Sequence, residues 1–575
     1  GYSSPQTIYL DTLTVMDPDF SFVASYDIDN LPVDDIDLTV EHGYIQPVNS
    51  DLYVNPVTGN DSNSGINPGD PLKTITYAYK IIKSDSITPH RIYLANGTYS
   101  GSMNGEKLPL GPRSYISVIG SGIDSTFIDG EYNTGFFLGI GTLKNYTIEN
   151  ITFQHGKWNH PSGIYIQNNN FVRIKNFEIK DGGYSASGGI TLIKIDLLIL
   201  KNIFIKNIVS YGVLGLSNWA ATTKTFTIEN CIIQNNLPDE DPINTGLEGG
   251  GLKIGGNSSP PYSYIGKITN LQITDNLRIP DPGWGPGMIG GYTQSNYCKV
   301  DMINATIGYN TVQGEFGFAA NANNGAELNV YNSIFYGDSL NELSLGYQNC
   351  PVPSEANISY SNFEGGFGNT YVWDSSVLNW LEGNIDADPK WDTSSTITYS
   401  LQWDSPCIDA GTPMYEFGMD YPYIKIEDEK IVLYKIDGDT IHLPQTDIAG
   451  NPRIVNGRID MGAYEFQDTG VRIREQFLQN LNELNIDVFP NPFHSHTFIS
   501  FVLVKKADVK VLIHDARGSV VKSLLDGSLP SGKYNLTWPG QDDSGNEAEN
   551  GAYLVSVYVD GIKMGSEKVV KNSSR

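Results

Sequence analysis

One stretch of the chain combines carboxylates with candidate bases. The acidic residues in it are Asp239, Glu240, Asp241 and Glu248. Lys253 follows between two apolar residues, and Arg278 lies in the next Pro- and Gly-rich stretch. Carboxylate oxygens are the ligands that Ca²⁺ prefers, and a lysine or arginine beside a bound cation can remove a proton that the metal has acidified. This combination would serve proton abstraction from an acidic sugar polymer.

Aromatic side chains accompany these charged residues. A flat ring offers an apolar face for a sugar ring, while nearby polar groups fix its orientation. The candidates for such stacking are Trp158, Tyr165, Trp219, Trp284 and Tyr292. Glycine clusters at 249–251 and 290–291 would leave a flat floor for the ligand. We therefore expect a polysaccharide as the partner of this surface, with Ca²⁺ as the candidate cofactor.

The same residues also have a plain structural interpretation. An acidic turn on a chain of net charge −28 is ordinarily solvated surface, and a neighbouring lysine ordinarily forms an ion pair worth less than about 1 kcal/mol. The histidines show no HxxxH metal spacing, and no Ser/His/Asp order is identifiable. Three functions stay open: a glycan-binding or adhesive surface protein, a calcium-dependent polysaccharide lyase or related glycan-degrading enzyme, and a structural component that self-associates.

An internal repeat defines the elements that must position these residues. Eight segments follow the order apolar, any, Asn, apolar, any, apolar, with intervals of 26, 26, 28, 40, 34, 28 and 30 residues. Their asparagines are Asn150, Asn176, Asn202, Asn230, Asn270, Asn304, Asn332 and, in a looser match, Asn362. Short strands with alternate inward side chains, repeated at this period, predict a right-handed parallel β-helix. Asparagine suits its bends, because it tolerates left-handed backbone angles and can bond to the asparagine one coil away.

The predicted fold class is all-β, with about ten coils and an N-terminal capping helix. Residues 71–84 carry apolar side chains at helical spacing, with Pro71 suited to the first turn. Such a helix would cover the open edge of the first coil. Cys231 falls at an inward position and predicts a core residue. One disulfide is possible among the other cysteines, which are Cys298, Cys350 and Cys407.

The charge balance of the chain disfavours two classes of partner. The 575 residues hold 65 acidic and 37 basic side chains, a balance that disfavours nucleic acid and anionic membrane surfaces. No apolar run approaches the roughly 18 residues of a membrane span. The first residue is Gly1, not Met, which is expected of a processed exported form and equally of a cloning remnant.

Two segments carry a resemblance to known β-helix proteins. YVNPVTGNDSNSGINPGDPLKTITYA (53–78), followed by RIYLANGTYSG (91–101), resembles the opening of secreted pectate-lyase-like proteins. DSPCIDAG (404–411) and DIAGNPRIVNGRIDMGAYEF (447–466) resemble the close of bacterial proteins called choice-of-anchor Q. The resemblance implies a β-helix over 51–410 and its close over 411–466.

The close has its own expected details. KIEDEKIVLYKIDGDTIHL (425–443) predicts a hairpin insertion with Asp-Gly at its turn. We interpret Asp409, Asp447 and Asp460 as turn and cap residues that accept hydrogen bonds from backbone NH groups. Residues 1–50 are expected to form an acidic arm or a small β segment.

The C-terminal segment resembles a third group. VFPNPFHSHTFISFVLVKKADVKVLIHDARGSVV (488–521) and LPSGKYNLTWPGQDDSGNEAENGAYLVSVYVDG (529–561) resemble a type A sorting domain of the type IX secretion system. The resemblance implies a small Ig-like β-sandwich over 486–575, a linker over 467–485, the type IX secretion machinery as partner, and a secreted or outer-surface protein. Trp538 and Tyr553 suit the core of the sandwich, and DDSG (542–545) predicts a turn.

Overall fold

The chain forms two compact units, residues 1–466 and 467–575. The computed structural model describes residues 47–140, 143–157, 163–182, 189–209, 213–218, 222–237, 251–256, 262–278, 288–312, 317–338, 341–346, 351–373, 375–392, 397–416, 418–467, 486–503, 506–530, 532–559 and 561–572. Within these residues, no helix has the length and apolar character needed to cross a membrane.

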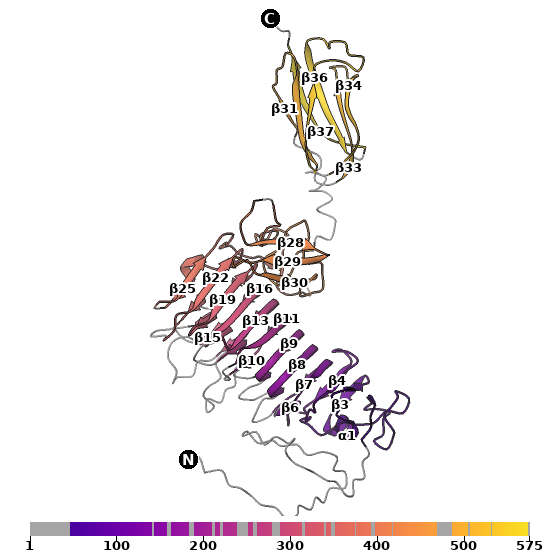
Figure 1. Ribbon diagram of the computed structural model, residues 1–575, viewed down its shortest axis with the longest axis vertical. Coiled ribbons are helices and arrows are strands. Elements are labelled where there is room, and N and C mark those ends of the chain that lie inside the picture. The colour runs from indigo at the N-terminus through magenta and orange to yellow at the C-terminus, as the bar shows by residue number, and fades with distance from the viewer. Residues whose placement is uncertain are drawn as a thin grey trace, which may run out of the picture. The chain divides into compact units, whose positions relative to one another are not determined.

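The first unit is a parallel β-helix, in which each coil pairs with the coil before and after it (Figure 1). Twelve strands of the described chain stack in parallel on one face, so the solenoid has two more coils than the ten expected. In order they are β1 (Leu52–Val54), β2 (His90–Leu94), β4 (Ile116–Ile119), β7 (Tyr146–Gln154), β8 (Ile164–Lys180), β9 (Ile190–Lys206), β11 (Lys224–Gln234), β13 (Tyr264–Thr274), β16 (Cys298–Gly308), β19 (Glu327–Tyr331), β22 (Glu355–Ser359) and β25 (Val377–Trp380).

Two further faces complete each coil. The longer strands bend at the repeated asparagine, so β7, β11, β13 and β16 each contribute to two faces, and β8 and β9, which also begin on the third face, contribute to three. The second face also contains β3 (Gly97–Tyr99), β5 (Thr126–Asp129), β20 (Ile334–Tyr336) and β23 (Asn362–Phe363). The third face contains β6 (Phe137–Ile140), the first halves of β8 and β9, β10 (Leu214–Ser217), β12 (Leu252–Gly255), β15 (Met288–Ser295), β18 (Gly317–Asn323), β21 (Asn341–Leu345) and β24 (Thr370–Val372).

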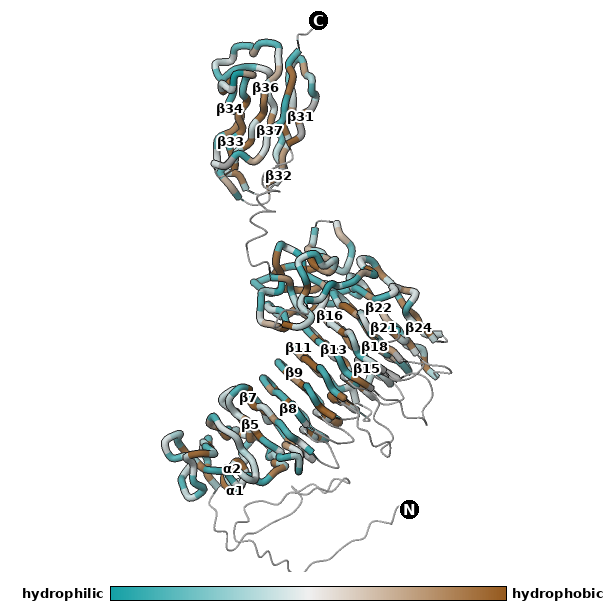
Figure 2. Tube along the Cα trace, turned by 180° about the vertical axis from the view of Figure 1, so that it is seen from behind, coloured by the Kyte–Doolittle hydropathy of each residue, from teal (hydrophilic) through white to brown (hydrophobic). Residues whose placement is uncertain are grey.

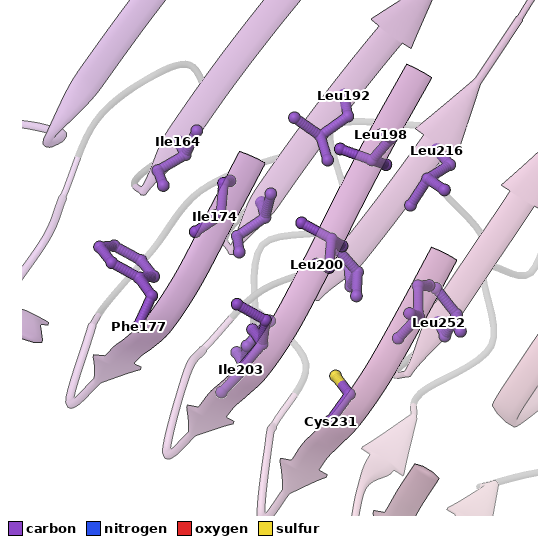
Figure 3. Close-up of a cluster of buried hydrophobic side chains, with 14 of the residues drawn as sticks. Ile164, Ile174, Phe177, Leu192, Leu198, Leu200, Ile203, Leu216, Cys231 and Leu252 are labelled. Atoms are coloured by element: carbon purple, nitrogen blue, oxygen red, sulfur yellow. The ribbon is translucent and has the colours of Figure 1, made fainter. Parts of the chain in front are cut away.

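The core consists of inward side chains that stack from coil to coil. Figure 3 shows Phe177, Ile203 and Cys231 following one another on β8, β9 and β11, and register places them directly opposite each other. All three are fully buried. Cys231 is therefore the core residue that the repeat predicted. Because each inward residue packs on its equivalent in the neighbouring coils, the hydrophobic contribution accumulates along the solenoid.

The predicted asparagine ladder is confirmed over five coils. The Nδ2 atom of Asn176 donates to Oδ1 of Asn150 at 2.8 Å, and the same bond joins Asn202 to Asn176, Asn230 to Asn202 and Asn270 to Asn230 at 2.6–2.9 Å. All five residues have φ between 45° and 61°. The left-handed backbone turns the strand through the corner, and the amide satisfies its neighbour.

Two more asparagines keep the corner but change partners. Asn304 and Asn332 also have positive φ, 55° and 51°. Asn304 donates to the carbonyl oxygens of Asp460 and Gly462, both at 3.1 Å. Asn332 Oδ1 accepts from the backbone N of Thr412 at 2.6 Å. The segment that follows the last coil, residues 397–466, therefore replaces the next asparagine as the partner of these amides. We call it the closing segment.

The prediction that Asn362 forms the last corner is wrong. Register pairs Tyr331 with Ser359 and Ile334 with Asn362, so Tyr360, with φ 48°, stands where Asn332 stands one coil earlier. Asn362 instead points away from the solenoid core, on the side where Ile334 packs against the closing segment. It is fully buried there and donates to the Ala387 carbonyl at 2.7 Å. The loose match to the repeat was shifted by two residues, so the predicted corner falls on an outward position of β23, next to the inward Phe363.

The first coil is covered by the predicted helix. α1 (Ile75–Ile81) begins after Thr74, whose side chain accepts from the N of Tyr77 at 3.1 Å. Pro71 therefore precedes the helix and does not lie in its first turn. The carboxylate of Glu106 accepts from the N of Ile75 at 2.7 Å, which satisfies one of the free NH groups at the helix start.

The cysteines within the described residues are free. Cys298 and Cys407 are buried thiols without a disulfide partner, so neither forms the bond considered from the sequence. Cys350 lies outside the described residues. Burial raises the pKa of the Cys298 thiol to about 12, which keeps it protonated and unreactive at neutral pH.

The second unit is a small Ig-like β-sandwich. One sheet contains β31 (Asp487–Phe489), β32 (Thr497–Leu503) and β35 (Gly532–Trp538), and the other contains β34 (Val520–Leu529), β33 (Ala507–His514), β36 (Gly551–Val559) and β37 (Ile562–Lys571). Hydrophobic and hydrophilic residues alternate along β33 (Figure 2), in step with its burial. Trp538 and Tyr553 lie in the core with ring centroids 5.0 Å apart, as predicted. Asp542 accepts from the N of Ser544 at 2.9 Å within the expected turn.

A pair of carboxyl groups is buried near the last coils. Glu342 on β21 is fully buried, and Asp338 follows β20 and accepts from the N of Asn310 at 2.6 Å. Burial, reinforced by the adjacent Asp338 carboxylate, raises the pKa of Glu342 far above its usual range. Burial also raises the pKa of Asp338. The folded pair therefore holds a proton that the unfolded chain releases near pH 4.5.

We predict that Glu342→Gln stabilises the solenoid at pH 8. The unfolded state binds fewer protons than the folded state above pH 4.5, so the wild type loses stability as the pH rises. The neutral amide removes this dependence, and the gain should reach about 1 kcal/mol or more, the equivalent of one pKa unit. Thermal unfolding at pH 4 and pH 8 measures it. Glu355→Gln, at an exposed site, is the control; equal shifts in both variants would contradict the prediction.

We also predict that Asn202→Ala destabilises the solenoid more than Asn202→Gly. Both variants lose two ladder bonds, each worth about 1 kcal/mol. Alanine carries the additional cost of left-handed backbone, about 1–2 kcal/mol, whereas glycine adopts φ 55° freely. Unfolding midpoints in denaturant distinguish the two. An equal loss would mean that the corner relaxes to another backbone angle.

Candidate functional site

A groove of about 1000 Å³ runs along the corner that the asparagine ladder forms. Its floor consists of four ladder asparagines, from Asn150 to Asn230, and therefore crosses four successive coils. At about 4.8 Å per coil, these four positions span roughly 14 Å. The groove thus follows the solenoid axis over a polar floor of regularly spaced amides.

One wall comes from the sheet beside the corner. Lys201 and Glu229 immediately precede their ladder asparagines on β9 and β11, and Lys267 lies three residues before Asn270 on β13. Lys201 Nζ and Glu229 Oε1 are 2.5 Å apart. On the other side of the corner, Phe204 presents a partly exposed ring to the groove. Together, the two sides of the corner place cations, a carboxylate and an aromatic face along the floor.

The opposite wall belongs to the closing segment. It contains a three-stranded antiparallel sheet, β28 (Tyr423–Glu427), β29 (Lys430–Tyr434) and β30 (Thr440–Leu443), where the sequence indicated a single hairpin. The Asp-Gly turn joins β29 to β30, with φ 85° at Gly438. His442 on β30 and the loop 444–450 line the groove. In Figure 1 this sheet lies against the side of the solenoid.

Arg453 attaches this wall to the ladder. Its guanidinium is almost fully buried and donates to Oδ1 of Asn270 at 2.5 Å and to the Ala463 carbonyl at 2.8 Å. Asn270 therefore bonds to Asn230 on one side and to the closing segment on the other. The ladder ends where Arg453 takes its last free acceptor.

Buried carboxylates surround Arg453. Its NH1 atom is 3.8 Å from Oε2 of Glu465. Burial raises the pKa of Glu465 to about 9, with the nearby Asp460 carboxylate contributing. Asp460 Oδ1 accepts from the N of Asp409 at 2.7 Å, and Asp447 Oδ1 accepts from the N of Ala449 at 2.9 Å. Asp447 and Asp460 are therefore the backbone acceptors that the sequence indicated, whereas Oδ1 of Asp409 is buried without a partner.

The candidate base Lys253 lies on another face. On β12 it is partly exposed between buried Leu252 and Ile254, so it points outward as predicted. Register places it in one outward row with Gly215, Thr191 and Tyr165. The two ends of this row are three strand spacings apart, about 14 Å. A side chain added at Gly215 would meet no atom within 4 Å, so the row has an open centre.

The remaining predicted residues fall in three groups. Tyr165 is partly exposed, and its hydroxyl donates to Gln167 at 2.8 Å. Arg278 lies on β14 (Leu277–Arg278), which pairs with β17 (Thr311–Val312) outside the large sheet. The candidates outside the described residues are Trp158, Trp219, Trp284, Asp239, Glu240, Asp241 and Glu248. Elsewhere, within the described chain, no three His, Cys, Asp or Glu side chains gather closely enough to hold a metal ion.

Tyr292 requires a correction. It was a candidate for sugar stacking, but its side chain is fully buried in the core and its hydroxyl donates to Gln294 at 3.0 Å. It pairs with the inward Leu252, so its direction follows from the alternation along β15. Such a residue contributes to packing and presents no face to a surface ligand.

Sequence reasoning missed the groove, although part of its signal was visible. Lys201 directly precedes Asn202, and Glu229 directly precedes Asn230. The repeat alone therefore places these two outward residues side by side on neighbouring coils. The opposite wall was not predictable in this way, because it comes from residues about 240 positions later in the chain.

The comparisons with known proteins come from sequence and from structure. Residues 57–333 match the model of a protein family of unknown function (DUF1565), and residues 495–561 match the FlgD Ig-like domain. No curated protein matches the chain significantly. Together with the architecture, these matches describe a β-helix protein with a C-terminal Ig-like domain.

Several solved structures resemble the chain. Azotobacter vinelandii mannuronan C-5 epimerase AlgE4 A-module is 13% identical, with 52% of this chain and 89% of that chain covered and a TM-score of 0.27. Pectin methylesterase PemA from Erwinia chrysanthemi is 10% identical, with 74% and 95% covered and a TM-score of 0.21. PorZ from Porphyromonas gingivalis is 16% identical, with 26% and 16% covered and a TM-score of 0.13. The chain spans only 12% to 30% of PorZ and two other matched structures.

We predict that Arg453→Met loosens the closing segment. The change leaves Asn270 Oδ1 and a buried carbonyl unpaired, at about 1–3 kcal/mol for each buried group. Limited proteolysis should cut between residues 411 and 466 faster than in the wild type, and the unfolding midpoint should fall. Lys430→Met, on an exposed residue of the same sheet, is the control. Wild-type cleavage rates in Arg453→Met would show that the anchor is elsewhere.

Proposed function

We propose that this protein binds an extended polysaccharide in the groove over the asparagine ladder. The observation that carries the proposal is the groove itself: about 1000 Å³, open along the solenoid axis, with a floor of asparagines repeated coil by coil. A polymer of repeating units suits a site whose own groups repeat. Each amide carries both donor and acceptor atoms, as sugar hydroxyls require.

The walls support a sugar ligand. Phe204 supplies a flat apolar face for a sugar ring, while Lys201 and Glu229 hold each other in place beside it. The groove contains two lysines against the carboxylates of Asp124 and Glu229, so its formal charge is balanced although the chain as a whole carries −28. Neutral and weakly acidic glycans can therefore approach this surface with less repulsion than elsewhere.

The setting proposed for this binding is the cell exterior. The C-terminal unit has the Ig-like sandwich expected of a type IX sorting domain, and residues 495–561 match an Ig-like family. We propose export through that machinery, followed by release or attachment at the outer surface, where binding to a polysaccharide would mediate adhesion. Fractionation of the producing cell with an antibody to residues 47–466 tests this location.

A second candidate function is calcium-dependent polysaccharide lysis. The observation that favours it is the outward row of Lys253 and Tyr165 with its open centre at Gly215. Lys253 would be the base, and the acidic residues 239–248 would bind Ca²⁺. Unsaturated products absorbing in the ultraviolet, formed with Ca²⁺ and lost in Lys253→Ala, would establish this activity.

Self-association is a third candidate. The last coil exposes three residues of its edge strands, Tyr371, Val372 and Val377, to 38–49%. Unpaired strand edges are natural contacts between copies. Light scattering of the purified protein should then show species above 63.2 kDa, and a strictly monomeric protein at high concentration would exclude this candidate.

We predict that Lys267→Ala and Phe204→Ala each weaken polysaccharide binding about three- to tenfold, equivalent to roughly 0.7–1.4 kcal/mol. Both side chains line the groove, and neither contributes to the asparagine ladder. A glycan array identifies the ligand, and calorimetry measures the affinity. Lys144→Ala, an exposed lysine of the same solenoid outside the groove, should bind as the wild type does. Unchanged affinity in both groove variants would exclude this site.

A further inference from the structure

Four tyrosines gather on the outer face of the sheet that forms the groove wall. Tyr423 and Tyr434 are cross-strand partners on β28 and β29, with ring centroids 4.9 Å apart. Tyr421 stacks on both, at 5.1 and 6.4 Å, and all three rings lie within 27° of parallel. Tyr415 adds a tilted ring 4.7 Å from Tyr423. We call these four residues the tyrosine platform.

The platform is held rigidly yet faces solvent. The ammonium of Lys425 lies 4.1–5.2 Å from the ring centroids of Tyr415, Tyr423 and Tyr434. The hydroxyl of Tyr434 donates to the Glu427 carboxylate at 2.6 Å. The outermost ring, Tyr421, is nevertheless 44% exposed. Tyr415 is 38% exposed, whereas Tyr423 is buried between its neighbours. A cluster of four rings with two of them exposed is more than a single exposed residue, which would need no explanation.

The platform is continuous with the groove through one strand. Tyr434 pairs with Thr440 on β30, and His442, two residues further along the same face, lines the groove. Two residues along a strand span about 7 Å, and cross-strand neighbours are about 5 Å apart. His442 also pairs with Val432, which pairs with Lys425. Tyr434 and Lys425 therefore lie within one or two side-chain lengths of His442, which lines the groove.

We propose that the tyrosine platform is a second binding subsite for the same polysaccharide, which leaves the groove past His442 and stacks its sugar rings on Tyr421. This inference rests on the proposed function and adds to it that the ligand is a long chain, which must reach beyond the groove. Tyrosine suits the role, because its ring stacks on the apolar face of a sugar while its hydroxyl meets the sugar hydroxyls.

The local chemistry favours a glycan over other occupants. Lys425 already occupies the cation-binding position of three rings, so an external ammonium group would compete with a tethered one. A proline-rich peptide also docks on aromatic surfaces, but it gives no reason for the platform to adjoin a groove lined by amides. A peptide ligand is therefore the alternative that the test must detect.

The test measures affinity against chain length. Oligosaccharides of increasing length, cut from the polysaccharide that the array identifies, are titrated into wild type, Tyr421→Ala, Tyr421→Phe and Tyr132→Ala. The wild type should gain affinity once the chain exceeds the groove. Tyr421→Ala should lose about three- to tenfold for long chains only, and Tyr421→Phe should retain most of the gain. Tyr132→Ala, at a tyrosine of the solenoid that is 50% exposed and lies outside the groove, should match the wild type.

Each outcome has one meaning. If short chains bind but long chains gain nothing, or if Tyr421→Ala loses nothing on long chains, the platform is no subsite while the groove proposal stands. If no chain binds and the groove variants behave as the wild type does, the proposed function itself fails. Binding of a polyproline peptide that Tyr421→Ala abolishes, without any effect on glycans, would assign the platform to a protein partner and overturn the inference.

Discussion

The hydrogen bond between successive asparagine amides is the constraint on which the first unit depends. It requires each coil to place the same backbone angle at the same height, because an amide can bond only to a neighbour directly above or below it. In the five coils that the ladder joins, this alignment agrees with the strand register and with the inward stacking of Phe177, Ile203 and Cys231. The groove lies between this aligned polar corner and the closing segment.

The same amides explain how the solenoid closes. From Asn270 onward, the acceptors and donors of the corner turn to Arg453, Thr412 and the carbonyl of Gly462. The closing segment therefore lies along the side of the solenoid, where it hydrogen-bonds to corner groups that no further ladder asparagine partners. Its sheet forms the second wall of the groove. Structure and candidate site thus share one set of contacts.

Much of the architecture was predictable, because the spacing of the repeat indicates which residues occupy equivalent positions in successive coils. The corner asparagines, the inward Cys231 and the helix near residues 75–81 follow from spacing alone. The failures have equally physical causes. Asn362 fits the residue pattern of the repeat but not its strand register. Tyr292 was chosen for sugar stacking because it is aromatic, although the alternation along its strand directs it inward. The wall around His442 depends on contacts between distant segments, which no local pattern contains.

The lateral attachment of the closing segment has a consequence for how such a molecule can change. The ladder amides from Asn150 to Asn230 bond to the amides of the neighbouring coils, whereas Arg453 bonds to Asn270 further along. Whole coils inserted or deleted between Asn150 and Asn230 would lengthen or shorten the groove, while the attachment of the closing segment at Asn270 would stay intact. The length of the groove can therefore evolve by duplication of single coils, independently of the closing segment.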